Sequence, residues 1–315
     1  MVNELSGEIL KVLRTSPDYV SGEVLSRELD ISRVSVWKHI HSLQQEGYII
    51  KASPKGYCLV SSPDLLLPYE FPDWEQKIHH FDELASTMDV ARELAKGRAE
   101  EGTIIVAETQ FQGKGRLGRK WLSPKGGIYF TIILRPKISP VYAPRINLMA
   151  SVAVAKTIRR LFGLKAELKW PNDVLIEGKK VCGILAEMDA EIDKVNSVNL
   201  GIGMNANTLI SEHEREATSL REQLGREMPR KEFFRSVVTE ILRYAQQQAV
   251  LTKTDLLEEW KSLSATLNRN VRIVAPGEEI VGKAIGIDTN GALLVKSQDG
   301  STRNVFAGDC IHLTS

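Results

Sequence analysis

Cysteine is scarce in this chain of 315 residues, and its placement argues against two kinds of cross-linked scaffold. The three cysteines, Cys58, Cys182 and Cys310, are odd in number, lie far apart and never form a C-x-x-C pair. We therefore expect neither a disulfide framework nor a cysteine zinc site. Unpaired thiols are typical of a reducing compartment, so we expect the protein in the cytoplasm.

Long apolar runs and an excess of one charge are also missing. The opening residues, MVNELSGEILKVL, carry acids and a helical period instead of the basic and apolar regions of a signal peptide. No apolar run approaches the length of a membrane span, so we expect neither secretion nor a membrane partner. Because the formal net charge is only +1, contact with nucleic acid or phosphate has to come from a local cluster of cations.

A proline-rich stretch and, further on, a change in the spacing of apolar residues divide the chain into three predicted domains, residues 1–63, 64–268 and 269–315. The boundary between the first two lies in SSPDLLLPYEFPDW, which we interpret as a linker. The middle segment mixes strand-like and long helical runs without regular β-α-β alternation, which favours an α+β domain over a doubly wound sheet. The last segment has a period of two and the turn signals DTNG and SQDGS, which predicts a small β-barrel or sandwich.

The first domain has the pattern of a winged helix-turn-helix. Three short helical stripes precede the segment YIIKASPKGYCLV, which predicts two strands around a Pro-Lys-Gly turn. Ser32 is the expected N-cap of the third helix. The apolar positions expected to face the core are Ile9, Leu10 and Leu13, then Val24, Leu25 and Leu29, then Val34, Trp37, Ile40 and Leu43.

The third helix is the one expected to enter the major groove of DNA. The residues off its apolar stripe are all hydrogen-bond donors, and the hairpin adds Lys51 and Lys55 for phosphates. The alternative is that these residues are the solvated face of a small helical bundle used for protein contact. The predicted DNA-binding residues are Ser32, Arg33, Ser35, Lys38, His39 and Ser42, with His41 on the same face.

Residues 113–121, GKGRLGRKW, contain the pattern G-x-G-x-x-G. A dinucleotide site would need a helix to begin here and an acid about 20 positions on, and the sequence provides neither. Protein-kinase motifs are also missing. The loop instead interleaves four cations, at positions 114, 116, 119 and 120, with glycines, which predicts a mobile clamp for phosphate. The alternative is a flexible, solvated hairpin tip.

A second cluster lies in KWPNDVLIEGKKVCGILAE, residues 169–187. It brings Lys169, Asn172, Asp173 and Lys180 close in sequence to a strand glycine, Gly183. A glycine within a strand often marks close approach of a ligand to the backbone. Taken alone, PND is also an ordinary turn and the lysines a solvated face.

These two stretches, with STMD at 86–89 and GIGMNAN at 201–207, resemble the biotin-protein ligases. The winged helix extends the resemblance to the bifunctional form, in which the ligase is also a repressor of biotin genes, and it covers essentially the whole chain. The resemblance implies an α+β multidomain fold. It has an N-terminal winged helix-turn-helix, a central mixed α/β domain like the class II aminoacyl-tRNA synthetases, and a C-terminal SH3-like β-barrel.

The resemblance also implies the reaction. The biotin carboxylate attacks the α-phosphate of ATP to give biotinyl-5′-AMP, and biotin then passes to a lysine of a biotin carboxyl carrier domain, such as that of acetyl-CoA carboxylase. A carboxylate is already ionised at neutral pH, so the first step needs cations instead of a general base. The implied catalytic residues are Arg116, Lys180, Lys169 and Asp173, with Asp173 as the carboxylate on the Mg²⁺ side.

Ligand contacts follow from the same resemblance. The implied biotin-binding residues are Ser86, Thr87, Met88, Gln110, Lys114, Gly115, Arg116, Trp121, Lys180 and Gly183. Those implied for the adenylate are Arg119, Asn172 and Asn205, and residues 208–222 are expected to order over the adenine. Lys114, Met88 and Ala217 depart from the family's usual arginine, asparagine and, in some members, aromatic residue. We expect these departures to alter the affinity for the intermediate more than the activity.

For regulation, the resemblance implies a homodimer that forms when the adenylate is bound and that binds a two-fold operator DNA. One alternative is a non-catalytic biotin sensor and repressor, which retention of Arg116, Asp173 and Lys180 argues against. A second is a lipoate-protein ligase, which would lack both the winged helix and the glycine-arginine loop.

Overall fold

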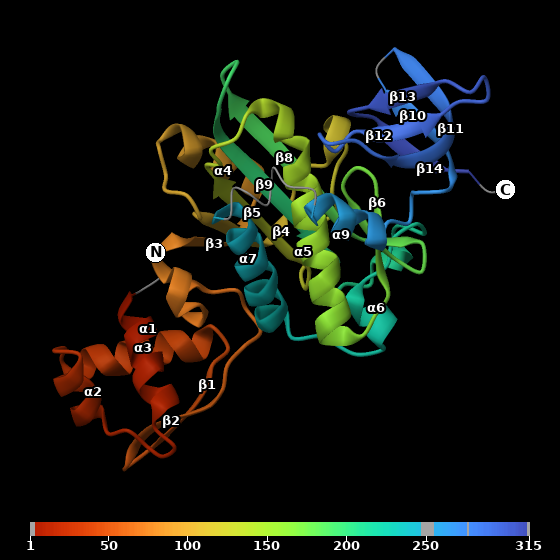
Figure 1. The fold of residues 1–315 in the computed structure, drawn as a ribbon. Helices are drawn as coiled ribbons and strands as arrows, with labels where there is room; N and C mark the ends of the chain where they lie inside the picture. The colour runs from red at the N-terminus through yellow and green to blue at the C-terminus, as the bar shows by residue number, and fades with distance from the viewer. Residues whose placement is uncertain (1–3, 247–254, 276, 314–315) are drawn as a thin grey trace. The chain divides into compact units, whose positions relative to one another are not determined.

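The computed structural model describes residues 4–246, 255–275 and 277–313 (Figure 1). Contacts between residues divide the chain into two compact units, Met1–His80 and Phe81–Ser315. None of the helices within the described ranges is long and apolar enough to cross a membrane. All three cysteines are free thiols, and Cys182 and Cys310 are buried in strands.

The first unit is a helix-turn-helix followed by a hairpin, as predicted. Its helices are α1 (Glu4–Thr15), α2 (Gly22–Glu28) and α3 (Arg33–Gln45), and its antiparallel strands are β1 (Ile49–Ser53) and β2 (Gly56–Ser61). Ser21 and Ser32 cap α2 and α3, each accepting a 3.1 Å hydrogen bond from a backbone N–H of the first turn. These caps satisfy N–H groups that a helix start leaves unpaired.

The core of this unit corrects one prediction about α3. Val36, Ile40 and Leu43 face the core, whereas Val34 and Trp37 are 64% and 56% exposed. The apolar residues of α3 form two sets at helical spacing, one with Val36, Ile40 and Leu43 and one with Val34 and Trp37. Packing against α1 and α2 buries the first set. The prediction that Val34 and Trp37 belong to the buried stripe was wrong.

The proline-rich segment predicted as a linker packs on the first unit. It forms two short 3₁₀ helices, η1 (Pro68–Glu70) and η2 (Pro72–Lys77), and buries Tyr69 and Phe71. The Tyr69 hydroxyl donates to Glu46 at the end of α3, and the Tyr48 hydroxyl donates to Glu70. The segment is thus part of the N-terminal unit.

A seven-stranded sheet forms the centre of the second unit, in the order β3-β4-β5-β9-β8-β7-β6. Every pair whose register is described runs antiparallel, which confirms an α+β domain in place of a doubly wound sheet. The strands are β3 (Ile78–Leu84), β4 (Ile104–Gln110), β5 (Ile128–Leu134), β6 (Ala166–Lys169), β7 (Asp173–Ile176), β8 (Lys179–Ala190) and β9 (Val195–Met204).

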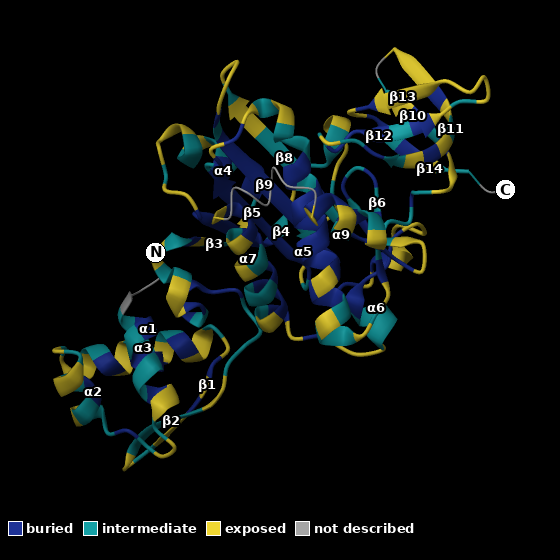
Figure 2. Ribbon diagram, in the orientation of Figure 1, coloured by how far each residue is buried: buried dark blue, intermediate teal, exposed yellow. Residues whose placement is uncertain are grey.

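Helices cover both faces of this sheet, and its central strands are buried (Figure 2). Helix α4 (Thr87–Lys96) packs on β4, β5 and β9, whereas α5 (Pro144–Phe162) packs on β6, β7 and β8 and against α7 (Arg230–Gln246) and α9 (Asp255–Leu263). Phe130 of β5 meets Phe234 of α7 edge to face at 5.1 Å, while its neighbour Thr131 contacts Thr87 of α4. Because successive strand residues point to opposite faces, α4 and α7 lie on opposite sides.

Shorter elements complete the second unit. They are η3 (Arg116–Gly118), η4 (Pro140–Tyr142), η5 (Ile210–Glu212) and α6 (Leu220–Leu224), and Ser219 and Glu222 form a capping box at the start of α6. One of the long helical runs that the sequence shows in the middle segment, KEFFRSVVTEILRYAQQQ at 231–248, matches α7, and its last two residues lie outside the described ranges.

The C-terminal segment is an antiparallel five-stranded sheet in the order β13-β12-β11-β10-β14. Its strands are β10 (Asn270–Ala275), β11 (Glu278–Ile287), β12 (Leu293–Lys296), β13 (Thr302–Val305) and β14 (Asp309–His312). The run TRNVFAGDCIHL is two strands separated by a turn in which Gly308 has φ +137°. Trp170 Nε1 donates to Gly291 O of this segment at 3.2 Å, which ties it to the turn after β6.

Candidate functional site

A cavity of about 260 Å³ opens on the face of the sheet that carries α4. It gathers residues from the start of α4, the glycine loop at 113–121, strands β8 and β9, and the first position of β14. Thirteen of the predicted site residues line it: Ser86, Thr87, Met88, Gln110, Lys114, Gly115, Arg116, Arg119, Trp121, Asn172, Asp173, Lys180 and Gly183. The predicted residues Lys169 and Asn205 do not.

The first turn of α4 forms the polar end of the cavity. Ser86 is the N-cap and accepts a 3.3 Å hydrogen bond from Met88 N. Gln110 Oε1 accepts from Thr87 N at 2.8 Å, and Gln110 Nε2 donates to Ser123 Oγ at 2.8 Å. Ser86 and Thr87 are almost fully buried. Because every group is held by a neighbour, these donors and acceptors are fixed before any ligand arrives.

Glycines in β8 and β9 form the floor. Gly183 and Gly203 are register partners, and Trp121 lies across both: a methyl group added at Gly203 would lie 2.5 Å from Trp121 Cε2. A methyl group added at Gly201, two residues earlier on β9, would lie 2.6 Å from the Met88 sulfur. Side chains larger than hydrogen at these positions would displace the Trp121 ring and Met88. Trp121 Nε1 is buried and has no hydrogen-bond partner in the described structure.

The glycine loop folds into a narrow hairpin with a single 3₁₀ turn at its tip. Gly115 N donates to Arg119 O at 2.8 Å, and Trp121 N donates to Gly113 O at 2.8 Å. Leu117 has φ +53° and Gly118 has φ +73°, so the tip needs two left-handed residues in succession. No α-helix begins at the loop, which agrees with the rejection of a dinucleotide fingerprint.

Arg116 is a half-buried cation of the site. Its Nη1 donates to Asn172 Oδ1 and to Gly308 O, both at 3.3 Å. Among the described residues no carboxylate lies within ion-pair distance of it. Burial lowers the pKa of Arg116, while the more distant charges of Asp309 and Asp173 oppose that shift. A half-buried guanidinium held by neutral groups is well suited to receive an anion.

Lys180, at the start of β8, is the second cation over the floor. Its Nζ lies 2.6 Å from Asp173 Oδ1, out of line for a hydrogen bond, and 5.2 Å from the centre of the Trp121 ring. The Lys180 backbone pairs with the segment that precedes α6, since its N–H donates to Glu216 O and its carbonyl accepts from Thr218 N. Residues 208–222 therefore approach the site beside Lys180.

Three further predicted residues, Asn172 in the turn between β6 and β7, Lys169 and Asn205, have different surroundings. Asn172 is buried, donates to Ile184 O at 2.6 Å and holds Arg116 with its oxygen. Lys169 ends β6, and its charge acts on His312 of β14. Asn205 follows β9 and donates to Thr218 O at 3.1 Å, which leaves its buried oxygen without a partner in the described structure.

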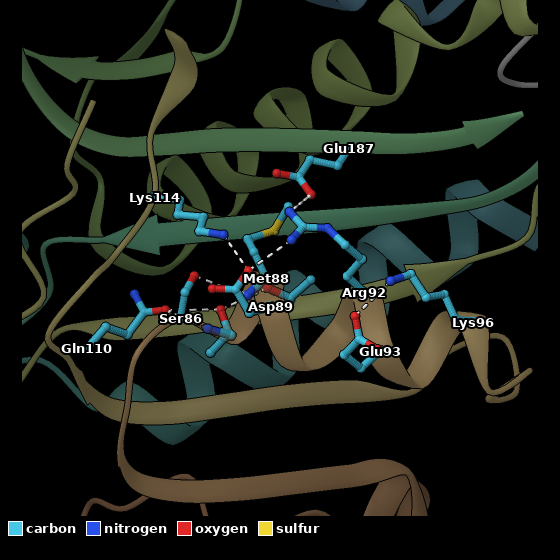
Figure 3. A network of polar contacts seen from close by, with 11 residues as sticks. Ser86, Met88, Asp89, Arg92, Glu93, Lys96, Gln110, Lys114 and Glu187 are labelled. Atoms are coloured by element: carbon cyan, nitrogen blue, oxygen red, sulfur yellow. Dashed lines mark hydrogen bonds and ion pairs between the residues drawn. The ribbon is translucent and has the colours of Figure 1, made fainter. Parts of the chain in front are cut away.

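Figure 3 shows a chain of polar contacts that continues from the loop across α4. Lys114 pairs with Asp89, and Arg92 lies 3.0 Å from Asp89 Oδ1 and 2.6 Å from Glu187 Oε2. The loop is therefore anchored to α4 through Lys114. The hydrogen bond to Glu187 raises the pKa of Arg92.

Four residues at or beside the site, Asp309, Asp89, Gly201 and Gly203, were not among the predicted site residues. Arg119 pairs with Asp309, which lies 190 residues later, at the first position of β14. Asp89 directly follows the STM motif, yet only the fold brings it to Lys114. Gly201 and Gly203 belong to GIGMNAN, and their spacing of two in a strand would have indicated one face of a sheet. No group of three or more His, Cys, Asp or Glu side chains in the described ranges is placed to hold a metal ion.

The predicted DNA-binding residues lie on different sides of α3. Arg33 and Lys38 are exposed, Ser35 and Ser42 are half-buried, and Ser32 uses its side chain to cap the helix. His39 points toward α1, where its Nδ1 lies 3.3 Å from Ser6 Oγ. Val34 and Trp37 occupy the exposed face with Arg33 and Lys38.

Comparison with known sequences agrees with this arrangement. Residues 81–205 match the biotin/lipoate A/B protein ligase family, residues 7–58 an HTH domain, and residues 266–313 the biotin protein ligase C-terminal domain. The bifunctional ligase/repressor BirA of Bacillus subtilis strain 168 is 36% identical over 304 residues, which cover 93% of each chain. The protein of the same name from Escherichia coli K12 is 28% identical over 95% of each chain.

Solved structures extend the comparison to three dimensions. The biotin protein ligase of Aquifex aeolicus, solved in complex with biotin and ATP, superposes with a TM-score of 0.63 at 28% identity. The match covers 76% of this chain and 99% of that one. With relatives this similar over nearly its whole length, the chain belongs to the biotin protein ligase family, among the members that also carry an N-terminal helix-turn-helix domain.

Proposed function

We propose that the protein activates biotin with ATP as biotinyl-5′-AMP, transfers the biotinyl group to a lysine of a biotin carboxyl carrier domain, and represses transcription through its N-terminal domain. One observation carries the ligase proposal. A single cavity joins a fixed polar end, an aromatic wall over a glycine floor, and two cations from separate strands and loops. These parts match the ureido head, the apolar ring and tail, and the carboxylate of biotin.

We assign the polar end to the ureido group. Ser86 Oγ already accepts from Met88 N, so its hydroxyl hydrogen remains to donate to the ureido oxygen. Gln110 holds the backbone N–H of the next residue, Thr87, at 2.8 Å. Trp121 then covers the valeryl chain, and the backbone at Gly183 lies within reach because no side chain intervenes.

We assign activation to cations. Both reacting groups are anionic, so the barrier falls when positive charge lies between them. Arg116 and Lys180 provide it, and Asn172 positions Arg116. Lys169 is the register partner of Asp173 across the turn between β6 and β7, and it adds positive charge from outside the cavity. The mixed anhydride would hydrolyse in water, and the glycine loop serves as its cover.

Magnesium is a further proposal. Mg²⁺ is commonly held by one or two carboxylates together with substrate phosphates and water, so a dedicated cage is not required. Asp173 faces the cavity beside Lys180 and fits that role. When bound with ATP, the ion would neutralise phosphate charge. We also assign the adenine to Asn172, Asn205 and residues 208–222, and the adenylate phosphate to Arg119 with Arg116.

We retain the finer architectural assignments as proposals. The proposed domains are 1–63, 64–268 and 269–315. The family matches at 7–58 and 81–205 fall within the first two and the match at 266–313 covers most of the third, while the segment just after residue 63 packs in the N-terminal unit. A class II aminoacyl-tRNA synthetase-like central domain is supported by the antiparallel sheet backed by helices, and an SH3-like barrel by the five short C-terminal strands. The free thiols support a cytoplasmic location.

Intact mass measurement of a purified carrier domain tests the ligase. The carrier is incubated with the protein, biotin and Mg-ATP, with Arg116→Ala and Lys180→Ala in parallel. We expect a biotin-sized increase at one lysine, slowed or made less selective by either variant. Lipoate in place of biotin should give no increase. Biotin binding without transfer would instead establish the non-catalytic sensor.

The repressor is tested separately. Gel shifts on an inverted-repeat operator should strengthen when biotin and ATP are added, because the adenylate-bound homodimer is the proposed DNA-binding form. Sedimentation under the same conditions should show the dimer. Gel shifts that do not change when biotin and ATP are added would contradict the coupling of adenylate binding, dimerisation and DNA binding, and would leave the ligase proposal intact.

A further inference from the structure

We infer that Val34 and Trp37 of α3 form an apolar reading surface for thymine methyl groups in the major groove of operator DNA. This inference rests on the proposed repressor function and gives it a base preference. It starts from the corrected orientation of α3. Val34 and Trp37 are 64% and 56% exposed, although both are large apolar residues on a helix whose opposite face is fully buried.

The two side chains form one wall of a groove. It has a volume of about 530 Å³ and lies between the start of α2, the exposed face of α3 and the hairpin tip. Arg33, Val34 and Trp37 contribute from α3, and Ser53 and Pro54 contribute from the hairpin. An apolar surface in such a recess needs an occupant, because isolated exposed residues are normal but a shared apolar wall marks a contact site.

Charge identifies the occupant as a nucleic acid duplex. Helix α3 contains no acidic residue, and Arg33 and Lys38 flank the apolar pair. Lys51 and Lys55 are exposed on the hairpin at the other side. Glu23 is the acid among the described residues of the groove lining, and a carboxylate there is able to accept from a cytosine amino group. The cations around the groove therefore suit contact with DNA phosphates, and the apolar pair between them suits contact with base edges.

Chemistry then selects the base. Val34 and Trp37 contribute aliphatic and ring carbon, and the apolar group in the major groove is the C5 methyl of thymine. The Trp37 ring is also held in advance, since it stacks on His41 with 5.5 Å between ring centres and an angle of 2°. A fixed ring loses little rotamer freedom on binding, so the contact favours affinity.

Deoxyuridine provides the test, because it differs from thymidine only by that methyl group. The full-length protein with biotin and Mg-ATP selects duplexes from a random pool, and each thymine of the selected site is then replaced singly. We expect at least one position per half-site where the replacement weakens wild-type binding about fourfold, the worth of one buried methyl. Val34→Ala or Trp37→Ala should abolish that sensitivity.

The matched control is Val60→Ala, which removes the same atoms from a half-exposed valine at the base of the hairpin. It should keep the wild-type thymine pattern. Carrier biotinylation and thermal melting report that each variant is folded. Tight selection of DNA with no position sensitive to deoxyuridine would overturn the inference and leave the repressor standing. Failure to select any duplex while the carrier is biotinylated would overturn the repressor function itself.

Discussion

One methyl group at Gly203 tests whether the Trp121 wall forms the biotin site. In Gly203→Ala the new Cβ would lie 2.5 Å from Trp121 Cε2, whereas carbon atoms in contact are about 3.5–4.0 Å apart. The backbone accepts alanine, because Gly203 lies in a strand outside the left-handed region. Trp121 must therefore move by about 1 Å, the overlap that these distances imply.

The expected size of the effect follows from that overlap. Overpacking by one methylene costs about 1–3 kcal/mol, and the ring that moves is the proposed wall for biotin. If the displaced ring occupies the space of the ligand, biotin affinity falls about 5- to 150-fold. Isothermal titration with biotin alone, without ATP, measures this directly.

A matched glycine supplies the control for Gly203→Ala. Gly286→Ala in β11 adds the same methyl, but it meets only Leu294 Cδ1 at 3.6 Å and should leave biotin binding unchanged. A smaller residue at 121, in the double variant Gly203→Ala with Trp121→Leu, should recover part of the loss. Binding of biotin to folded Gly203→Ala within twofold of wild type would refute the placement of Trp121 in the biotin site.

Three further predictions concern the loop and the C-terminal sheet. The Arg116→Ala variant should release the adenylate roughly 10- to 100-fold faster than wild type, which corresponds to the loss of charged hydrogen bonds, and Arg116→Lys should release it at an intermediate rate. A chase experiment measures the release, and equal rates for the variants and wild type would contradict this prediction. Asp309→Asn should speed proteolysis of the glycine loop but change unfolding free energy by less than about 0.5 kcal/mol, because its partner Arg119 is 67% exposed. Burial, with repulsion from Lys169 and Arg269, lowers the pKa of His312 to about 4, against about 6.5 in the unfolded chain. The unfolded state therefore binds more protons between these values, so stability is lost as pH falls from about 6.5 to about 4; His312→Gln should flatten Tm against pH there, and an unchanged slope would contradict it.

Much of the fold was predictable because each element carries its own period. The alternation in the C-terminal strands and the long runs of α5 and α7 identify those elements without reference to any neighbour. Helix α3 differs, since Val36-Ile40-Leu43 and Val34-Trp37-His41 both repeat at helical spacing. Periodicity alone does not decide which face is inside. The packing of α1 and α2 decides it, and that information is not local.

The candidate site divides in the same way. Ser86, Gln110, Trp121 and Gly183 lie in or beside motifs whose residue types already match the ligand, and the fold brings them to one cavity. Asp309 has no such signal, because its place beside Arg119 depends on how the C-terminal sheet meets the central one. Sequence spacing also gave no means of separating Asn172, which lines the cavity, from Asn205, which does not.

The hardest question for the sequence was which cation of the glycine loop meets the ligand, because composition treats them alike. In the structure Lys114 is paired with Asp89, and Arg119 with Asp309. Arg116 is instead held by two neutral oxygens, with its charge not matched by any carboxylate in direct contact among the described residues. An incoming anion has to compete with an existing ion pair at the first two positions but not at Arg116. The two paired cations therefore hold the loop in place. Of the other two, Lys120 is exposed and Arg116 is half-buried, so we propose that Arg116 is the one that binds phosphate.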